Sequence, residues 1–175
     1  MSGDARAQTE LYSLFAPKMF GICLRYAKDS TEAEDNLQEG FVKVFTYIKG
    51  FKHQGSFEGW MRRIMVNVSL EKYRKQHLMY PVEDVGVYER QNFSNEILDK
   101  ITAEELIELI QQLTPRYRMV FNLYVMEGMN HKEISEEMNI SVGTSKSNLA
   151  RARDILKSKV LELYGDLEEK TNSTA

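Results

Sequence analysis

Residues 129–153 have the sequence MNHKEISEEMNISVGTSKSNLARAR, which carries the strongest local structural signal in the chain. Asn130 and Glu133 have the spacing of a capping box, which predicts the start of a short helix. Ser141 is a favourable N-cap for a second helix, which we expect to run to about Tyr164. A short helix, a tight turn and a longer helix in this order indicate a helix-turn-helix. In that motif the second helix enters the major groove of DNA.

The two faces of the second helix differ in chemistry. The inward positions are apolar or small: Val142, Leu149, Ala152 and Leu156. Ile140 fills the angle between the two helices. The outward positions can donate hydrogen bonds to phosphates or base edges: Lys146, Ser147, Asn148, Arg151 and Arg153. Residues 141–160 hold 5 basic side chains and 1 acidic one. The alternative to DNA binding is an amphipathic helical hairpin whose basic face is simply solvated.

Two further helices are predicted before this motif. Thr102 and Glu105 have the spacing of another capping box, at the start of a helix over residues 101–113. Thr114-Pro115 then combines a capping hydroxyl with a proline at the first helical position. The apolar stripe of that helix ends before Gly128 and consists of Tyr117, Val120, Phe121, Tyr124 and Val125.

The N-terminal part predicts three helices. The first has an apolar stripe at three- and four-residue steps, formed by Leu11, Phe15, Met19, Ile22 and Tyr26. Pro17 interrupts this stripe and should kink the helix or begin a new one. Ser30 or Thr31 should cap the second helix, which runs to about Lys49. Ser56 should cap the third, over residues 57–76.

Residues 79–100 contain Pro81, Gly86 and several acids but no sustained apolar stripe, so we expect an interdomain linker there. The 10 glycines and 3 prolines among 175 residues leave long stretches without helix breakers. The predicted fold is therefore all-α, with two small helical domains joined by a flexible linker, the second a helix-turn-helix domain. The domains are expected at 1–78 and 101–165, with a polar tail at 166–175.

Several functional classes are disfavoured by composition. The three histidines (His53, His77 and His131) lack metal-ligand spacing to one another or to Cys23, so no metal site is predicted. No glycine-rich phosphate loop or nucleophile motif indicates a catalytic residue, a cofactor or a small-molecule substrate. A single cysteine, no long apolar run and no secretory signal pattern predict a cytoplasmic protein.

Residues 51–75, FKHQGSFEGWMRRIMVNVSLEKYRK, mix aromatic and cationic side chains. Such a mixture suits single-stranded nucleic acid, because bases stack on rings while cations follow the backbone. Trp60 also fits a core position in its helical stripe. Asn67 could hydrogen-bond an extruded base or make a contact within its helix. The block charges of +3 for residues 1–78, −6 for 79–113 and +2 for 114–163 agree with two polyanion-facing modules.

Four segments together resemble a known family. AEDNLQEGFVKVF (33–45), GSFEGWMRRIMVN (55–67), LTPRYRMVF (113–121) and HKEISEEMNISVGTSKSNLARAR (131–153) are similar in order and spacing to ECF (extracytoplasmic-function) sigma factors, over residues 8–163. The resemblance implies a non-catalytic transcription-initiation factor with a promoter-melting domain and a domain for the minus-thirty-five element. Its implied partners are promoter DNA, core RNA polymerase (β′ clamp helices and β flap) and an anti-sigma factor.

The resemblance also implies roles for individual residues. Polymerase binding falls on Asp35, Asn36, Gln38, Glu39 and Phe41. Capture of a flipped minus-ten base falls on Lys52, Phe57, Arg62, Arg63, Asn67 and Arg74. The minus-thirty-five contacts fall on Lys132, Thr144, Lys146, Ser147, Asn148, Arg151 and Arg153.

Three residues depart from the family pattern. Asn148 stands where arginine is common, Ala150 where the residue is often bulky, and Ser145 where it is usually apolar. Because asparagine pairs with adenine, Asn148 is expected to alter the upstream base preference. The alternative function is a helix-turn-helix repressor or response-regulator output that is not a polymerase subunit.

Overall fold

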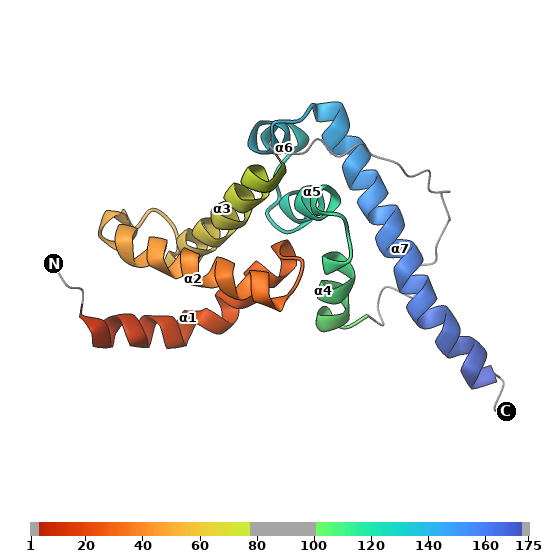
Figure 1. The fold of residues 1–175 in the computed structure, drawn as a ribbon, viewed down its shortest axis with the longest axis horizontal. Coiled ribbons are helices and arrows are strands. Elements are labelled where there is room, and N and C mark those ends of the chain that lie inside the picture. Colours follow the sequence, from red (N-terminus) through yellow and green to blue (C-terminus); the bar gives the residue numbers. More distant parts are fainter. Residues whose placement is uncertain (1–3, 78–100, 173–175) are drawn as a thin grey trace. The chain divides into compact units, whose positions relative to one another are not determined.

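The computed structural model describes the backbone of residues 4–77 and 101–172, and the side chains of 4–76 and 101–164. The chain divides into two compact units, Met1–Pro81 and Val82–Ala175. The described residues form α-helices and one short 3-10 helix, with no strand (Figure 1). The prediction of an all-α fold with two helical domains is confirmed. The predicted linker at 79–100 lies outside the described residues.

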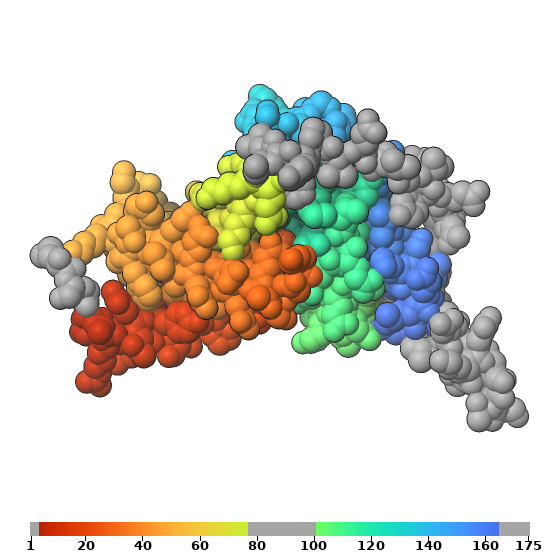
Figure 2. All heavy atoms as spheres, viewed as in Figure 1, coloured from red at the N-terminus to blue at the C-terminus, as the bar shows by residue number. Residues whose placement is uncertain are grey.

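The first unit packs three helices against one another: α1 (Ala5–Tyr26), α2 (Ser30–Tyr47) and α3 (Phe57–His77). A 3-10 turn, η1 (Ile48–Gly50), follows α2. In the space-filling view the atoms of α1 and α2 lie directly against one another (Figure 2). The core side chains come from all three helices and include Met19, Ile22, Leu37, Val44, Met61, Met65 and Val68.

One local prediction for this unit is narrowed and another is wrong. The helix α1 continues through Pro17, so the proline does not begin a new helix. Because proline has no N–H, the Ser13 carbonyl loses its usual helical donor at residue 17. Ser13 and Pro17 are both exposed, so water can satisfy that carbonyl. The N-cap of α2 is Asp29, whose Oδ1 accepts a hydrogen bond from the Glu32 N–H at 2.8 Å, and neither Ser30 nor Thr31. A carboxylate also complements the positive end of the helix dipole.

A glycine sets the distance between α2 and α3. A Cβ atom on Gly40 would overlap the sulfur of Met65 and lie 2.8 Å from its Cε. Met65 itself is completely buried, so its side chain has little room to move. Gly40 therefore allows the two helices to approach closely at this point.

The second unit contains α4 (Ala103–Gln111), α5 (Pro115–Val125), α6 (His131–Met138) and α7 (Val142–Asn172). Both predicted capping boxes are present, at Thr102 with Glu105 and at Asn130 with Glu133. Pro115 is at the start of α5 as predicted, but the Thr114 hydroxyl makes no capping bond. The helix α7 extends past the predicted end at Tyr164, through a sequence rich in the strong helix formers Leu, Glu and Lys.

The connection between α4 and α5 is held by a buried arginine. Arg118 is on α5, and its Nη2 donates to the carbonyl oxygens of Gln111 and Leu113, at 2.8 Å each. These carbonyls end α4, where a cation is also favoured by the helix dipole. The arginine thereby fixes the angle at which α5 leaves α4. The core around it includes Ile110, Leu113, Val120, Leu123, Ile134, Leu149, Ala152 and Leu156.

Candidate nucleic-acid interface

The helices α6 and α7 form the predicted helix-turn-helix. Asn139 ends α6 in the left-handed conformation (φ 52°), which asparagine tolerates better than most residues. The Ser141 hydroxyl then accepts a hydrogen bond from the Thr144 N–H at 2.9 Å and starts α7. Buried Ile134, Met138 and Leu149 hold the motif together.

The outward face of α7 differs from the prediction at Asn148. Its side chain is only 1% exposed, and neither amide atom has a hydrogen-bond partner. A helix turns about 100° per residue, so position 148 lies beside buried Ser145 and Ala152. The prediction that Asn148 faces DNA and recognises adenine is therefore wrong. The exposed residues of this face are Gly143, Lys146, Ser147, Ala150, Arg153 and Lys157.

Other predicted contacts on the motif differ in exposure. Lys132 is exposed on α6, and the half-buried Thr144 hydroxyl pairs with that of Ser141 at 2.9 Å. Arg151 is half-buried, and its Nη1 donates to the Tyr117 hydroxyl at 3.3 Å, which directs it along α5. Val142, predicted to face inward, is 40% exposed, because the first turn of α7 projects beyond the core.

A histidine that the sequence did not indicate connects three helices of this unit. The Nδ1 atom of His131 lies 2.9 Å from the Ser145 hydroxyl, which is completely buried on α7. The imidazole also stacks on Tyr124 of α5, with 4.8 Å between ring centroids. Arg153 lies over the same tyrosine ring, 5.5 Å from its centroid. Burial lowers the pKa of His131, and the charges of Lys146 and Arg153 lower it further.

The only sequence signal for this contact was the polar Ser145 at a position that is usually apolar in the family. A buried hydroxyl requires a hydrogen-bond partner, and His131 supplies it from the preceding helix. The pair thus orients the first turn of α7 relative to α6.

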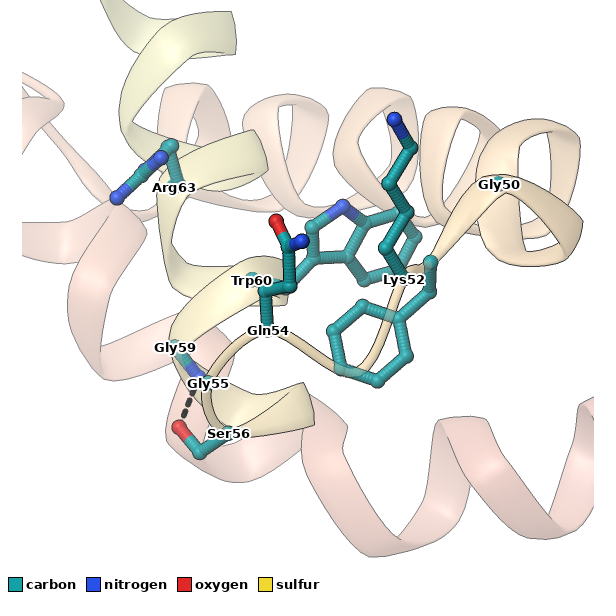
Figure 3. A pocket seen from close by; sticks show the side chains of 9 residues that line it. Gly50, Lys52, Gln54, Gly55, Ser56, Gly59, Trp60 and Arg63 are labelled. Carbon is teal, nitrogen blue, oxygen red and sulfur yellow. Dashed lines mark hydrogen bonds between the residues drawn. The ribbon is translucent and has the colours of Figure 1, made fainter.

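In the first unit, the loop between η1 and α3 forms a pocket of about 430 Å³. Its lining consists of Gly50, Phe51, Lys52, Gln54, Gly55, Ser56, Gly59, Trp60 and Arg63. In the view of Figure 3 the Trp60 ring and the Gln54 amide lie between the side chains of Lys52 and Arg63. The volume and the ring suit one unstacked base with a cation on either side.

Aromatic packing and two unusual backbone angles shape this loop. Phe51 and Phe57 lie 5.4 Å and 5.5 Å from the Trp60 ring, and Phe57 also contacts Phe15 of α1 at 5.8 Å. His53 (φ 55°) and Gly55 (φ 108°) reverse the chain between these rings. The Ser56 hydroxyl then accepts from the Gly59 N–H at 3.0 Å and caps α3 (Figure 3). Trp60 is half-buried, so it forms a wall of the pocket and not the centre of the core.

The pocket gathers only part of the residues predicted for the minus-ten element. Lys52 and Arg63 line it, while Phe57 stacks on the Trp60 ring. Asn67 is exposed one helical turn beyond Arg63 and does not line the pocket. Arg62 and Arg74 are half-buried elsewhere on α3. Gln54, which lines the pocket, was not singled out from the sequence.

The predicted polymerase surface on α2 also requires correction. Asp35 and Gln38 are exposed and Glu39 is half-buried, as an outward arc requires. Asn36 is 2% exposed and donates to the Ser69 hydroxyl at 3.4 Å, so it is a core residue. Phe41 is also 2% exposed and packs on Tyr12, with 4.6 Å between ring centroids. Neither side chain can contact a partner in this structure.

One residue of this arc was missed. Val42 is 65% exposed and lies one turn after Gln38 and Glu39 on the same side of α2. Glu39 in turn pairs with Lys43, with 3.6 Å between Oε1 and Nζ, and Lys43 reaches Glu71 of α3. The arc therefore places one apolar side chain beside acidic and polar ones.

The described residues contain no group of three or more His, Cys, Asp or Glu side chains placed to hold a metal ion. Among the described helices, none combines the length and apolar character that a membrane span requires.

Comparison with known proteins matches the two units to two regions of one protein family. The family model for Sigma-70 region 2 matches residues 11–78, and that for Sigma-70, region 4 matches residues 103–156. The ECF RNA polymerase sigma factor SigW of Bacillus subtilis (strain 168) is 30% identical over 173 residues, covering 92% of each chain. The chain belongs to the ECF sigma factors.

Other relatives agree with this assignment. The ECF RNA polymerase sigma-E factor of Haemophilus influenzae is 27% identical, covering 92% of this sigma factor and 91% of that one. The sigma factor RpoE of Bartonella quintana, solved in complex with the anti-sigma factor NepR, has the same fold. Its TM-score is 0.50 at 19% identity, covering 88% of this chain and 96% of that chain. In this sigma factor the loop pocket lies within the region 2 match, and the helix-turn-helix within the region 4 match.

Proposed function

We propose that this ECF sigma factor binds core RNA polymerase and directs it to promoters through two DNA contacts, one in each unit. The observation that carries the proposal is the presence in one chain of a helix-turn-helix with an exposed basic face and a separate base-sized pocket with cationic and aromatic walls. The polymerase supplies the catalysis, and this chain supplies none.

Residues 101–165 of the second unit would contact the minus-thirty-five element. Lys146, Ser147 and Arg153 are exposed on α7 and can reach phosphates or base edges. Lys132 lies on α6, where helix-turn-helix proteins contact the DNA backbone. Thr144 and Arg151 are less exposed and would contribute at the edges of this surface.

Residues 1–78 of the first unit would capture an unstacked base of the minus-ten element. Unstacking a base costs a few kcal/mol, which stacking on Trp60 and contacts with the loop must offset. Lys52 and Arg63 would neutralise the adjacent phosphates. Arg62, Asn67 and Arg74 would follow the strand along α3, outside the pocket.

The arc on α2 would bind the polymerase clamp helices of the β′ subunit. Asp35 and Glu39 can form charge-assisted hydrogen bonds with basic partner residues, while Val42 contributes apolar contact area. The second unit would reach the β flap. An anti-sigma factor would restrain the protein in the cytoplasm, since the Bartonella quintana relative was solved with one.

A binding experiment separates this function from that of a repressor. The full chain should retain core polymerase in a pull-down without DNA, whereas a repressor would bind duplex DNA alone. Asp35→Arg with Glu39→Arg should weaken polymerase binding while the helicity is retained. The matched control is Glu136→Arg with Glu162→Arg, which makes the same charge change at two exposed acids of the second unit. Equal affinity of both double variants for core polymerase would contradict the proposed α2 surface.

A further inference from the structure

Beyond Gly143 in its first turn, the exposed face of α7 has one position without a polar side chain. Lys146 and Ser147 lie one turn before Ala150, and Arg153 lies one turn after it. Ala150 is exposed, and it lies about 12 Å along the helix from Val142, at 1.5 Å per residue. It is therefore at the centre of the face that the cations flank.

The flanking side chains differ from Ala150 in reach. Lysine and arginine are long, and on this stripe they can extend to phosphates on either side of a groove. A side chain of one carbon has no such reach, and it allows the helix backbone to approach whatever lies opposite. Ala150 would therefore face the base edges at the floor of the groove and not the phosphates.

Asn148 does not compete with Ala150 for a base contact, because it is buried. Asn148 was the expected base contact, but its side chain points into the core. Ser147 remains on the stripe, and its hydroxyl can pair with more than one base. An alanine methyl can neither donate nor accept a hydrogen bond. The base-edge feature that it matches in the major groove is the 5-methyl group of thymine.

We propose that Ala150 is a specificity-determining residue that recognises the 5-methyl group of one thymine in the upstream promoter element. The inference rests on the proposed minus-thirty-five role of the second unit, and it names the chemistry of one base contact there. It also moves the position of sequence recognition from the buried Asn148 to the centre of the exposed stripe.

The test replaces thymine by uracil, which removes the methyl group and leaves the hydrogen-bonding edge unchanged. The probe is the upstream duplex recovered from a randomised promoter library by the full chain with core polymerase. Each thymine of either strand is replaced in turn, and binding is measured at fixed salt. One replacement should weaken binding about fourfold, the value expected for burying one methyl group.

Variants of the protein show which side chain is responsible for the weaker binding to the uracil duplex. Ala150→Gly should bind the thymine and uracil duplexes equally at the sensitive position. Ala103→Gly removes the same methyl group from an exposed site on α4 and should keep the fourfold difference. Ala150→Ser is a second variant for the case in which the glycine variant loses helicity. It keeps the Cβ atom but makes the position polar, so it should also reduce the difference in binding between the thymine and uracil duplexes.

The outcomes are distinct. A uracil scan without a sensitive position, or a sensitivity that persists in both Ala150 variants, would overturn the inference while the sigma-factor role stands. If the full chain with polymerase enriches no common upstream sequence, the proposed minus-thirty-five role fails and the inference fails with it.

Discussion

Asn148 offers a direct test of how the recognition helix is oriented. Its amide is buried without a hydrogen-bond partner on α7. A buried polar group left unsatisfied costs about 1–3 kcal/mol of folding free energy. Leucine has a similar length and no polar atom, and it is a better helix former. Asn148→Leu should therefore raise the unfolding free energy of the second unit by about 1–3 kcal/mol.

The assay must report on the second unit alone. The chain has a single tryptophan, Trp60, and it is in the first unit, so its fluorescence does not report on α7. Amide hydrogen exchange of α5 and α7 under native conditions gives the opening free energy of these helices. Ser147→Leu is the control, because a substitution at the adjacent exposed position should change stability by no more than about 0.5 kcal/mol.

A second readout distinguishes burial from DNA contact. Asn148→Leu should leave the preferred base at every upstream position unchanged, because the side chain does not reach the groove. A loss of more than about 1 kcal/mol on replacement by leucine would show that the amide has partners in solution. A changed base preference with an unchanged fold would show that Asn148 faces DNA after all. Either result would refute the orientation of α7 described above.

Three further predictions concern the other parts of the chain. Gly40→Ala should destabilise the first unit by about 1–3 kcal/mol in denaturation followed by tryptophan fluorescence, because the new methyl group overlaps a buried methionine; Gly21→Ala, with nothing near its Cβ, should not destabilise it. Burial holds the pKa of His131 below its usual 6.5, so the unfolded chain takes up the proton first as pH falls. The stability present above about pH 6.5 is then lost below it, and hydrogen exchange should show that His131→Phe removes this loss. Lys52→Ala with Arg63→Ala should reduce permanganate reactivity of the melted strand while upstream duplex binding persists; normal melting would place base capture elsewhere.

Local signals in the sequence were sufficient for most of the helices. The two capping boxes, at Thr102 and Asn130, depend on side chains three residues apart, so they could be identified without knowledge of the tertiary structure. The Asp29 cap was missed because Ser30 and Thr31 are equally favourable residues beside it. Only the backbone geometry determines which of these three adjacent residues caps the helix.

The errors at the candidate site have a common cause. Asn36 and Phe41 were assigned from the resemblance, which gives positions along the chain and not directions around a helix. Asn148 was assigned to the outward face because its side chain is polar, and polarity does not give that direction either. Polar residues at buried positions made it harder to infer which side of α7 faces the core. Ser145 is one of them: it is completely buried, and His131 provides the hydrogen-bond partner of its hydroxyl. The loop pocket depends on a left-handed His53 and on aromatic contacts with α1, neither of which has a local sequence signal.

Transcription in vitro by core polymerase with the full chain, on a randomised promoter library, shows whether the chain acts as a promoter-specificity subunit of RNA polymerase. We expect transcripts that start at discrete positions downstream of a common upstream sequence with two separated elements. Transcription that stays at the level of core polymerase alone, together with tight binding of the chain to duplex DNA without polymerase, would contradict it.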